Sequence, residues 1–420
     1  MTVQQTNLAN GLRIVTEAMP GIESTSLGVW VNVGARSESA DLNGVSHMLE
    51  HMAFKGTTSR SALDIAEQIE SVGGHLNAYT SREQTAYFAR VLGDHVPLAI
   101  DILGDILMHS TFDPDEVERE RGVILQEIGE AHDTPDDLVF DLLQEAAFPD
   151  QPVGRPILGT PDHVRAFSSQ TLKTYMTDHY LADHMVFAAA GKVDHDAIVA
   201  QLGAAFAGLA AGDEPAFQPA RYEGGDRRVD RPLEQLHLTL GFPGFSYGDD
   251  DFYAGQLLSS ILGGGMSSRL FQEVREKRGL AYSVYSFSGS LADGGMFGIY
   301  AGTGPDQADE LSRVIAAEVK KLCEQVGDDE FERARTQLKA STLMALENSG
   351  SRVEGFARQL FVFGRIVPMA ELVENLNAVT KEQVMAAALS LIEPGQVTMA
   401  SVGPEQSAHS YEKVTADFAV

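Results

Sequence analysis

Two stretches of this chain recur at nearly the same spacing, which limits the folds open to it. The charged run 115–121 (DEVERER) returns as 329–335 (DEFERAR), 214 residues later. A run of small and apolar residues ending at Gly191 resembles one ending at Gly403, with the two glycines 212 residues apart. Two matches at nearly one offset indicate an internal duplication, so we expect two similar domains.

Each half of the chain mixes strand and helix patterns. Alternation of apolar with polar or small residues predicts strands at 8–17, 24–34, 75–80, 84–92, 234–242, 281–289 and 295–302. Helical periodicity predicts helices at 44–54, 61–72, 94–110, 114–131, 251–262 and 267–277. Because hairpins and helices are segregated, the expected class is α+β, with two similar domains that each have a sheet flanked by helices.

The boundary between the expected domains falls near the middle of the chain. At 420 residues the chain is too long for one ordinary core. Residues 208–235 contain Gly-Asp-Glu-Pro and Gly-Gly-Asp and show little periodicity. We therefore expect an N-terminal domain at 1–210, a linker at 211–233 and a C-terminal domain at 234–420.

The pentad His47-Met48-Leu49-Glu50-His51 has the form H-x-x-E-H of inverted zinc hydrolases. On a helix, positions i, i+3 and i+4 share a face, so both imidazoles can hold one metal ion beside the carboxylate. Apolar residues at 45, 48, 49 and 52 form the opposite stripe. The plainer interpretation is a surface helix with two solvated histidines.

A catalytic zinc usually has three protein ligands and one water, so an acidic residue elsewhere must complete this set. The predicted helix at 114–131 carries the best candidates, Glu120 and Glu127, which are two turns apart on one face. Two histidines and a carboxylate suit Zn²⁺ but also fit Mn²⁺ or Co²⁺. The plainer interpretation is that both glutamates are ordinary solvated helix charges.

Composition excludes several classes of protein. The net charge of −29 argues against binding to nucleic acid or anionic membranes. One cysteine, Cys323, permits neither an intrachain disulfide nor a cysteine-based zinc cluster. The sequence has no secretory signal pattern and no apolar run of membrane-spanning length. These features favour a bacterial-type cytoplasmic location, or the mitochondrial matrix if a targeting segment has been removed.

The string HMLEHMAFKGT at 47–57, followed by RGVILQE at 121–127, resembles the pitrilysin-type (M16) zinc metallopeptidases. The resemblance runs from about residue 7 to 403 and is greatest to the half-length branch with mitochondrial processing peptidase β subunits and bacterial homologues. It implies one zinc per chain, held by His47, His51 and Glu127, with Glu50 as catalytic base and Glu120 as a supporting residue. It also implies two similar α+β domains per chain.

The same resemblance implies a set of substrate contacts. The segment 74–80 resembles the family's edge strand beside the zinc, where an extended peptide would add as a strand. Arg and Tyr in 275–282 resemble a pair that contacts substrate near the scissile bond, and acidic residues after the zinc helix match positions that recognise an upstream arginine. The residues implied are Phe54, Asn77, Ala78, Tyr79, Asp137, Asp141, Arg275 and Tyr282.

The function expected from these features is a zinc-dependent endopeptidase acting on extended or unfolded peptides, with a preference for basic residues. Because one chain carries both the pentad and the Arg275/Tyr282 motif, we expect a homodimer. A heterodimer with an inactive homologue and a scaffold subunit resembling a respiratory core protein remain as alternatives. The glycine-rich run 263–265 lacks the G-K-[ST] of a phosphate loop, and the second half lacks H-x-x-E-H, so neither nucleotide nor metal is expected there.

Overall fold

A computed structural model of the protein describes residues 3–213, 217–404 and 410–419. The chain divides into two compact units. Unit 1 comprises residues 1–129, 155–218 and 344–366, and unit 2 comprises 130–154, 219–343 and 367–420. Each unit is built on one sheet with helices packed on it, which confirms the expected α+β class with two similar domains.

Unit 1 has a six-stranded sheet. Its strands have the order β1-β2-β6-β3-β5-β4, and only the neighbours β2 and β6 are parallel. The strands are β1 (Val3–Asn7), β2 (Arg13–Ala18), β3 (Ser24–Val31), β4 (His75–Thr80), β5 (Thr85–Leu92) and β6 (Met185–Gly191). The sheet therefore ends at β4, whose outer backbone edge has no neighbouring strand among the described residues.

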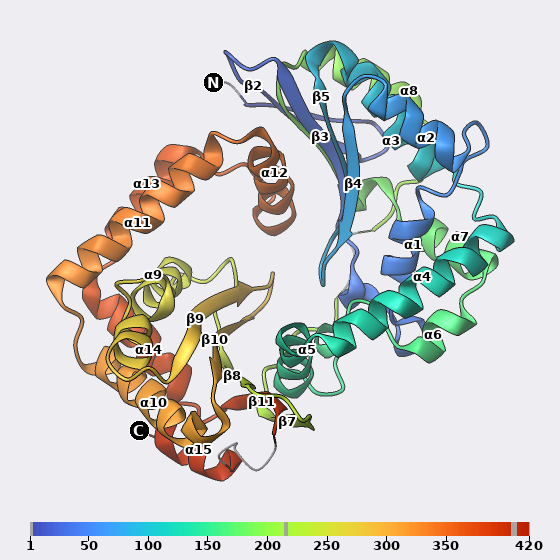
Figure 1. Ribbon diagram of the computed structural model, residues 1–420. Coiled ribbons are helices and arrows are strands. Elements are labelled where there is room, and N and C mark those ends of the chain that lie inside the picture. Colours follow the sequence, from blue (N-terminus) through green and yellow to red (C-terminus); the bar gives the residue numbers. More distant parts are fainter. Residues whose placement is uncertain (1–2, 214–216, 405–409, 420) are drawn as a thin grey trace. The chain divides into compact units, whose positions relative to one another are not determined.

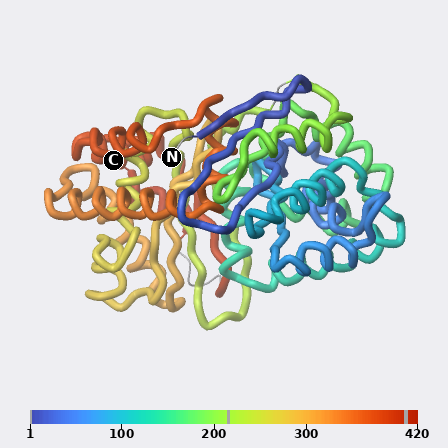
Figure 2. The backbone as a smooth tube through the Cα atoms, turned by 90° about the horizontal axis from the view of Figure 1, so that it is seen from above, coloured from blue at the N-terminus to red at the C-terminus, as the bar shows by residue number. Residues whose placement is uncertain are grey.

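One face of this sheet is covered by helices from the first half of the chain, some of which are visible in Figure 1. Buried apolar residues on each helix pack against the inward-facing residues of β3 and β5 in one core. These helices are α1 (Val45–Met52), α2 (Ala62–Glu70), α3 (Val96–Met108), α4 (Pro114–Asp133), α6 (Pro161–Ala166), α7 (Ser169–His179) and α8 (His195–Ala205). Figure 2 shows α8 in light green alongside the blue β1–β2 hairpin, where the His195 ring bonds the Thr6 and Thr16 hydroxyls.

The other face of the unit 1 sheet is covered by a helix from the second half of the chain, α12 (Ser349–Phe363). Its buried Val353, Phe356 and Leu360 pack on Trp30 and neighbouring residues of the sheet. Arg352 on α12 forms an ion pair with the buried Glu17 of β2. Unit 1 therefore needs a segment more than three hundred residues along the chain to cover its sheet.

Unit 2 has a five-stranded sheet with the order β7-β11-β8-β10-β9. Its strands are β7 (Gly225–Asp230), β8 (Leu236–Pro243), β9 (Ala281–Ser290), β10 (Gly295–Thr303) and β11 (Thr398–Gly403). One face packs against α9 (Phe252–Gly263), α10 (Ala308–Glu324), α14 (Lys381–Ile392) and α15 (Tyr411–Phe418), with α11 (Asp328–Leu346) and α13 (Met369–Ala378) adding residues to this core. The other face is covered by α5 (Pro135–Ala147), which comes from the first half of the chain.

The two sheets repeat one topology. The order β2-β6-β3-β5-β4 matches β7-β11-β8-β10-β9, and in each sheet the first two strands of that series are the parallel pair. The strands β2 and β7 begin 212 residues apart, as do β3 and β8. This spacing is the one found between the two glycines in the sequence, and it supports the duplication.

Three local predictions differ from the structure. The predicted strand 8–17 is interrupted, because residues 8–12 form a turn in which Gly11 has a φ of +102°, which favours glycine. The expected linker 211–233 contains β7, which pairs with β11, and its residues 214–216 lie outside the described residues. The predicted helix 267–277 is a short π-helix, η6 (Phe271–Glu276). No helix within the described residues is long and apolar enough to cross a bilayer.

Candidate metal centre

The pentad lies on α1, as its spacing predicts. Val45, Met48, Leu49 and Met52 are buried in the unit 1 core, so His47, Glu50 and His51 are left on the other face. The residue before the helix is Gly44 with a φ of +96°, and a Cβ there would lie 2.7 Å from the Leu158 carbonyl oxygen. A side chain at this position would therefore displace the start of the helix.

Glu38 caps the start of α1 from outside the pentad. Its carboxylate accepts hydrogen bonds from the backbone N–H groups of Gly44 and Ser46, both at 2.8 Å, and from the Asn43 amide at 3.1 Å. Burial raises the pKa of this carboxyl to about 7, against the lowering effect of these donors. A glutamate nine residues before the first histidine carries no sequence signal of this role, so pattern reasoning misses it.

The side chains of His47, His51 and Glu127 converge on one point. Oε2 of Glu127 lies 3.6 Å from Nε2 of His47 and 3.6 Å from Nε2 of His51, too far for hydrogen bonds. Tetrahedral ligation at about 2.0–2.1 Å separates ligand atoms by roughly 3.4 Å, so this spacing fits a zinc ion. All three ligand atoms lie within 4.8 Å of one another, and no other such cluster occurs in the described part of the chain.

The position of Glu127 follows from the pattern of α4. Val117, Glu120 and Ile124 are the buried residues of this helix, and Glu127 continues the same stripe one turn later. The Glu127 side chain is 42% exposed and that of Glu120 only 7%, so Glu127 reaches the open side of the cluster. The structure thus brings together the three residues that the resemblance implies as ligands.

Burial shifts the pKa values of His47 and Glu50, the two groups whose protonation matters for chemistry at this centre. Burial, with a smaller effect of neighbouring His51, lowers the pKa of His47 to about 4. His47 is therefore neutral at neutral pH, the form that binds metal. Burial also raises the pKa of Glu50, while a hydrogen bond from Thr80 opposes that rise. Both shifts follow from enclosure of the face that α1 turns toward β4.

Glu120 connects the centre to a lysine. Its Oε2 lies 3.1 Å from Nδ1 of His51 and its Oε1 lies 2.6 Å from Nζ of Lys55. An acceptor at Nδ1 places the ring proton there and leaves the Nε2 lone pair free for a metal. Nδ1 of His47, by contrast, is buried with no hydrogen-bond partner among the described residues. Lys55 lies within the string at 47–57 that carries the family resemblance, yet its charge alone does not predict this contact.

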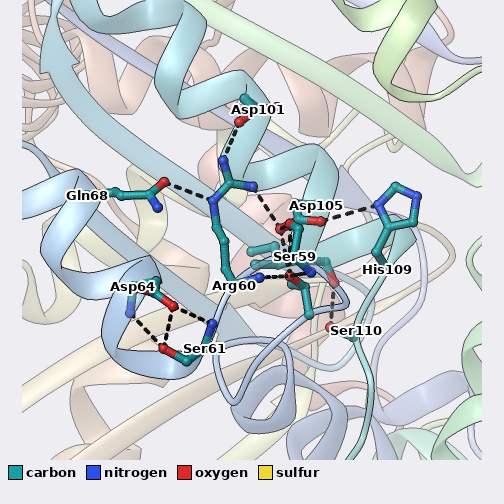
Figure 3. Close-up of polar contacts among 11 residues, drawn as sticks. Ser59, Arg60, Ser61, Asp64, Gln68, Asp101, Asp105, His109 and Ser110 are labelled. Atoms are coloured by element: carbon teal, nitrogen blue, oxygen red, sulfur yellow. Dashed lines mark hydrogen bonds and ion pairs between the residues drawn. The ribbon is translucent and has the colours of Figure 1, made fainter.

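The chain that follows α1 is fastened to α3 by a polar cluster (Figure 3). Oδ2 of the buried Asp105 accepts hydrogen bonds from the Thr57 and Ser59 hydroxyls and from the Arg60 guanidinium, each at 2.7 Å. Nδ1 of His109 lies 3.3 Å from the other oxygen of Asp105. Because residues 57–60 begin only two positions after Lys55, this cluster fixes the segment that places Lys55 beside Glu120.

The edge strand β4 lies beside α1. Its last residue, Thr80, donates a hydrogen bond of 2.6 Å to Oε2 of Glu50. Three residues predicted to contact substrate lie on this strand: Asn77 is exposed, and Ala78 and Tyr79 are half-buried. Phe54, two residues after the end of α1, is also half-buried, with its ring centroid 6.4 Å from that of Tyr87.

The remaining predicted substrate residues belong to unit 2. Asp137 and Asp141 lie on α5, the first exposed and the second half-buried. The Arg275 guanidinium on η6 lies 4.3 Å from the ring centroid of Tyr282 on β9, which is 75% exposed. The structure therefore brings Arg275 and Tyr282 together as a pair, and it assigns the aspartates to a different element of the same unit.

Fold and site together define a two-domain α+β protein with a candidate metal centre, and comparison with known proteins identifies its family. The chain belongs to the insulinase family, peptidase family M16: the family model matches residues 13–161, and the model of the Peptidase M16 inactive domain matches residues 166–338. The resemblance drawn from the strings at 47–57 and 121–127 is thereby confirmed.

Relatives and solved structures agree with this assignment. An uncharacterized zinc protease of Streptomyces coelicolor is 43% identical over 401 residues, which cover 93% of this chain and 87% of that protein. A probable mitochondrial-processing peptidase subunit beta of Arabidopsis thaliana is 38% identical over 423 residues, covering 97% and 80% respectively. The crystal structure of a protease from Helicobacter pylori has a TM-score of 0.90 at 22% identity, covering 96% of this chain and 99% of that one, and so shares the fold.

Proposed function

We propose that this protein is a zinc-dependent endopeptidase that cleaves extended or unfolded peptides. The observation that carries the proposal is the convergence of two imidazole nitrogens and one carboxylate oxygen beside Glu50. Three ligands leave one position of a tetrahedral site open, as catalytic zinc sites require. The relative from Streptomyces coelicolor is named a zinc protease, which supports the same chemistry.

His47, His51 and Glu127 would hold one zinc ion per chain. When bound, the metal supplies Lewis acidity, which makes a water molecule acidic enough to ionise near neutral pH and polarises a carbonyl group. Glu50 would accept the proton of the attacking water and later deliver it to the leaving amine. A raised pKa suits a group that both takes and returns a proton, and burial supplies that rise. Glu120 would hold the His51 ring in the metal-binding tautomer.

An extended peptide would bind along β4. Two hydrogen bonds define which backbone groups face the free edge: Ser81 N–H donates to the Gln84 carbonyl at 2.7 Å, and Ala78 N–H donates to its neighbour Asn77 Oδ1 at 2.9 Å. Because hydrogen-bonded and non-bonded pairs alternate in an antiparallel ladder, residues 76, 78 and 80 turn their backbone groups outward. In strand addition the hydrogen bonds go to the peptide backbone, so binding depends little on the sequence of the peptide.

Three further contacts complete the proposal. Arg275 and Tyr282 would contact substrate and the charge that develops on the carbonyl oxygen, and the stacking of the guanidinium on the ring supports their action as one unit. Phe54 would line the pocket just after the cleavage point. Asp137 and Asp141, four residues apart on α5, would receive a basic side chain upstream of it.

The test of the proposed function compares the wild type with Glu50→Gln. We expect both proteins to bind one zinc per chain, and only the wild type to cleave a mixture of unfolded peptides. Gln keeps the shape of Glu but cannot take a proton at neutral pH. Zinc bound by both proteins with equal hydrolysis would remove Glu50 as base, and absence of stoichiometric zinc would remove the metal centre itself.

A second candidate is a catalytic chain that requires a different, inactive partner. The similarity to a protein named as a subunit of a processing peptidase favours it. The presence of Arg275 and Tyr282 in the same chain as the pentad favours a homodimer in which the pair serves the facing copy. Mixing inactive Glu50→Gln with inactive Arg275→Ala protein should restore part of the activity of a shared-site homodimer. A scaffold without activity would give no hydrolysis from any mixture.

The preference for basic peptides needs its own experiment. Paired peptides that differ only by Arg or Ala upstream of the cleaved bond are compared with wild type and with Asp141→Asn. We expect faster cleavage of the Arg peptide by the wild type and a smaller ratio for the variant. Equal rates on both peptides would reject the assignment of Asp137 and Asp141.

A further inference from the structure

The carboxylate of Glu50 is held by one residue outside α1. Oγ1 of Thr80 lies 2.6 Å from Oε2 of Glu50, a short distance for an O–H···O bond and typical of a charged acceptor. A carboxylate can only accept, so the hydroxyl donates its single proton to Glu50. The backbone of Thr80 also acts on this carboxyl as a weaker hydrogen-bond donor, so Thr80 supplies both hydrogen bonds described for Glu50.

The backbone of Thr80 also has a defined direction. It is the last residue of β4 and pairs with Thr85 of β5 in the position where backbone groups do not bond across the pair. Its N–H and C=O groups therefore face the free edge of the sheet. Its side chain lies on the same sheet face as those of Leu76 and Ala78, which pack against the core that contains α1. One residue thus presents its backbone to the edge and its hydroxyl to Glu50.

We propose that Thr80 is a positioning residue whose hydroxyl fixes the orientation of the Glu50 carboxylate for proton transfer. This inference rests on the proposed function, since it gives Glu50 its role as base. Without the hydroxyl, the carboxylate loses its strongest hydrogen bond and rotates more freely about its terminal bond, a broad torsion with no strongly preferred orientation. The fraction of molecules with the base aimed correctly would then fall, while metal binding and peptide pairing would be unaffected.

Binding and base alignment are coupled by this arrangement. A peptide added along β4 orders the backbone at Thr80, and the same residue directs Glu50. Side-chain identity at Thr80 should therefore change the rate of the chemical step, kcat, rather than KM, because the backbone groups that pair with the peptide remain in every variant. A purely structural hydroxyl would not produce this separation.

The experiment uses three variants of the full-length zinc-loaded protein. Thr80→Val removes the hydroxyl and keeps the β-branched shape, Thr80→Ser keeps the hydroxyl, and Thr85→Val is the matched control. Thr85 lies opposite Thr80, and its hydroxyl donates a hydrogen bond of 2.9 Å to the Val33 carbonyl and not to Glu50. For Thr80→Val we expect kcat to fall about 10- to 100-fold, the usual effect of losing a hydrogen bond to a charged group, with KM changed less than about twofold.

Zinc affinity, measured by chelator competition, gives a readout that does not depend on activity. It should be the same in Thr80→Val as in the wild type, and both Thr80→Ser and Thr85→Val should keep most of kcat. In a Glu50→Gln background, Thr80→Val should have no further effect on residual activity. A kcat for Thr80→Val within about twofold of wild type, a matching loss in Thr85→Val, or lost zinc would overturn the proposal. Inactive wild-type protein would instead refute the proposed function, before Thr80 is tested.

Discussion

Lys55→Met should weaken zinc binding although Lys55 does not reach the metal centre itself. Nζ of Lys55 contacts Oε1 of Glu120, and Oε2 of the same carboxylate holds Nδ1 of His51. Met keeps the length and apolar stem of Lys and removes only the charge. The carboxylate of Glu120, 7% exposed, would then have a histidine as its remaining partner in this cluster.

The size of the effect follows from the geometry. Two unit charges about 4 Å apart attract by about 4 kcal/mol at an effective dielectric constant of about 20. The desolvation of Lys55, whose side chain is 31% exposed, offsets part of this attraction. Another part stabilises only the Glu120 carboxylate and does not reach the metal ligands. Loss of an outer partner of a metal ligand typically lowers affinity about 10- to 100-fold, or about 1.4–2.7 kcal/mol. We expect Lys55→Met to fall in this range.

The assay is chelator competition for zinc on four proteins: wild type, Lys55→Met, Lys55→Arg and Lys173→Met. Lys173 is an exposed lysine on α7 and controls for the loss of one positive charge. Lys55→Arg should retain most of the affinity, because a guanidinium also pairs with a carboxylate. A zinc Kd for Lys55→Met within about threefold of wild type, or an equal loss in Lys173→Met, would refute the reasoning.

Three other predictions concern stability. Arg352→Met leaves the carboxylate of Glu17, 1% exposed, without its ion-pair partner and should lower the free energy of unfolding by about 3–5 kcal/mol in urea denaturation; a loss under about 1 kcal/mol would contradict this. The second prediction concerns the metal-free protein, prepared with a chelator, in which the pKa of His47 is lowered from 6.5 to about 4. The unfolded chain binds a proton at this residue at a higher pH than the folded chain does. The free energy of unfolding is therefore highest above pH 6.5 and falls as the pH is lowered to 4. Wild type should lose up to about 3 kcal/mol relative to His47→Gln across that window, and parallel pH profiles would reject the shift. Asp105→Asn removes a buried charge that accepts three hydrogen bonds and should cost about 2–4 kcal/mol, detected as a lower Tm; an unchanged Tm would show that the cluster does not stabilise the segment after α1.

Local periodicity predicts much of the fold and the shared face of His47, Glu50 and His51, whereas the resemblance at 121–127 implies Glu127 as the third ligand. The stripe of apolar residues on α1 turns the two histidines and Glu50 to one face. The seven-residue spacing of Glu120 and Glu127 places both on one face of α4. Helical spacing is a property of the backbone, so these relations hold wherever the helices pack.

The residues that sequence reasoning missed act through contacts between distant segments. The helices α5 and α12 are not among the predicted ones, and local periodicity does not show that each packs on the sheet of the unit formed mainly by the other half of the chain. Glu38, Lys55 and Thr80 are ordinary polar residues in sequence. Their roles depend on the distances to Gly44, Glu120 and Glu50, which only tertiary packing sets.

Zinc K-edge X-ray absorption of the metal-loaded protein tests the central claim most directly. We expect a single zinc environment with two imidazole nitrogens and carboxylate and water oxygens at about 2.0–2.2 Å, and loss of one oxygen shell contribution in Glu127→Gln. A spectrum with fewer than two imidazoles, or one that Glu127→Gln leaves unchanged, would contradict the assignment of His47, His51 and Glu127 as the metal ligands.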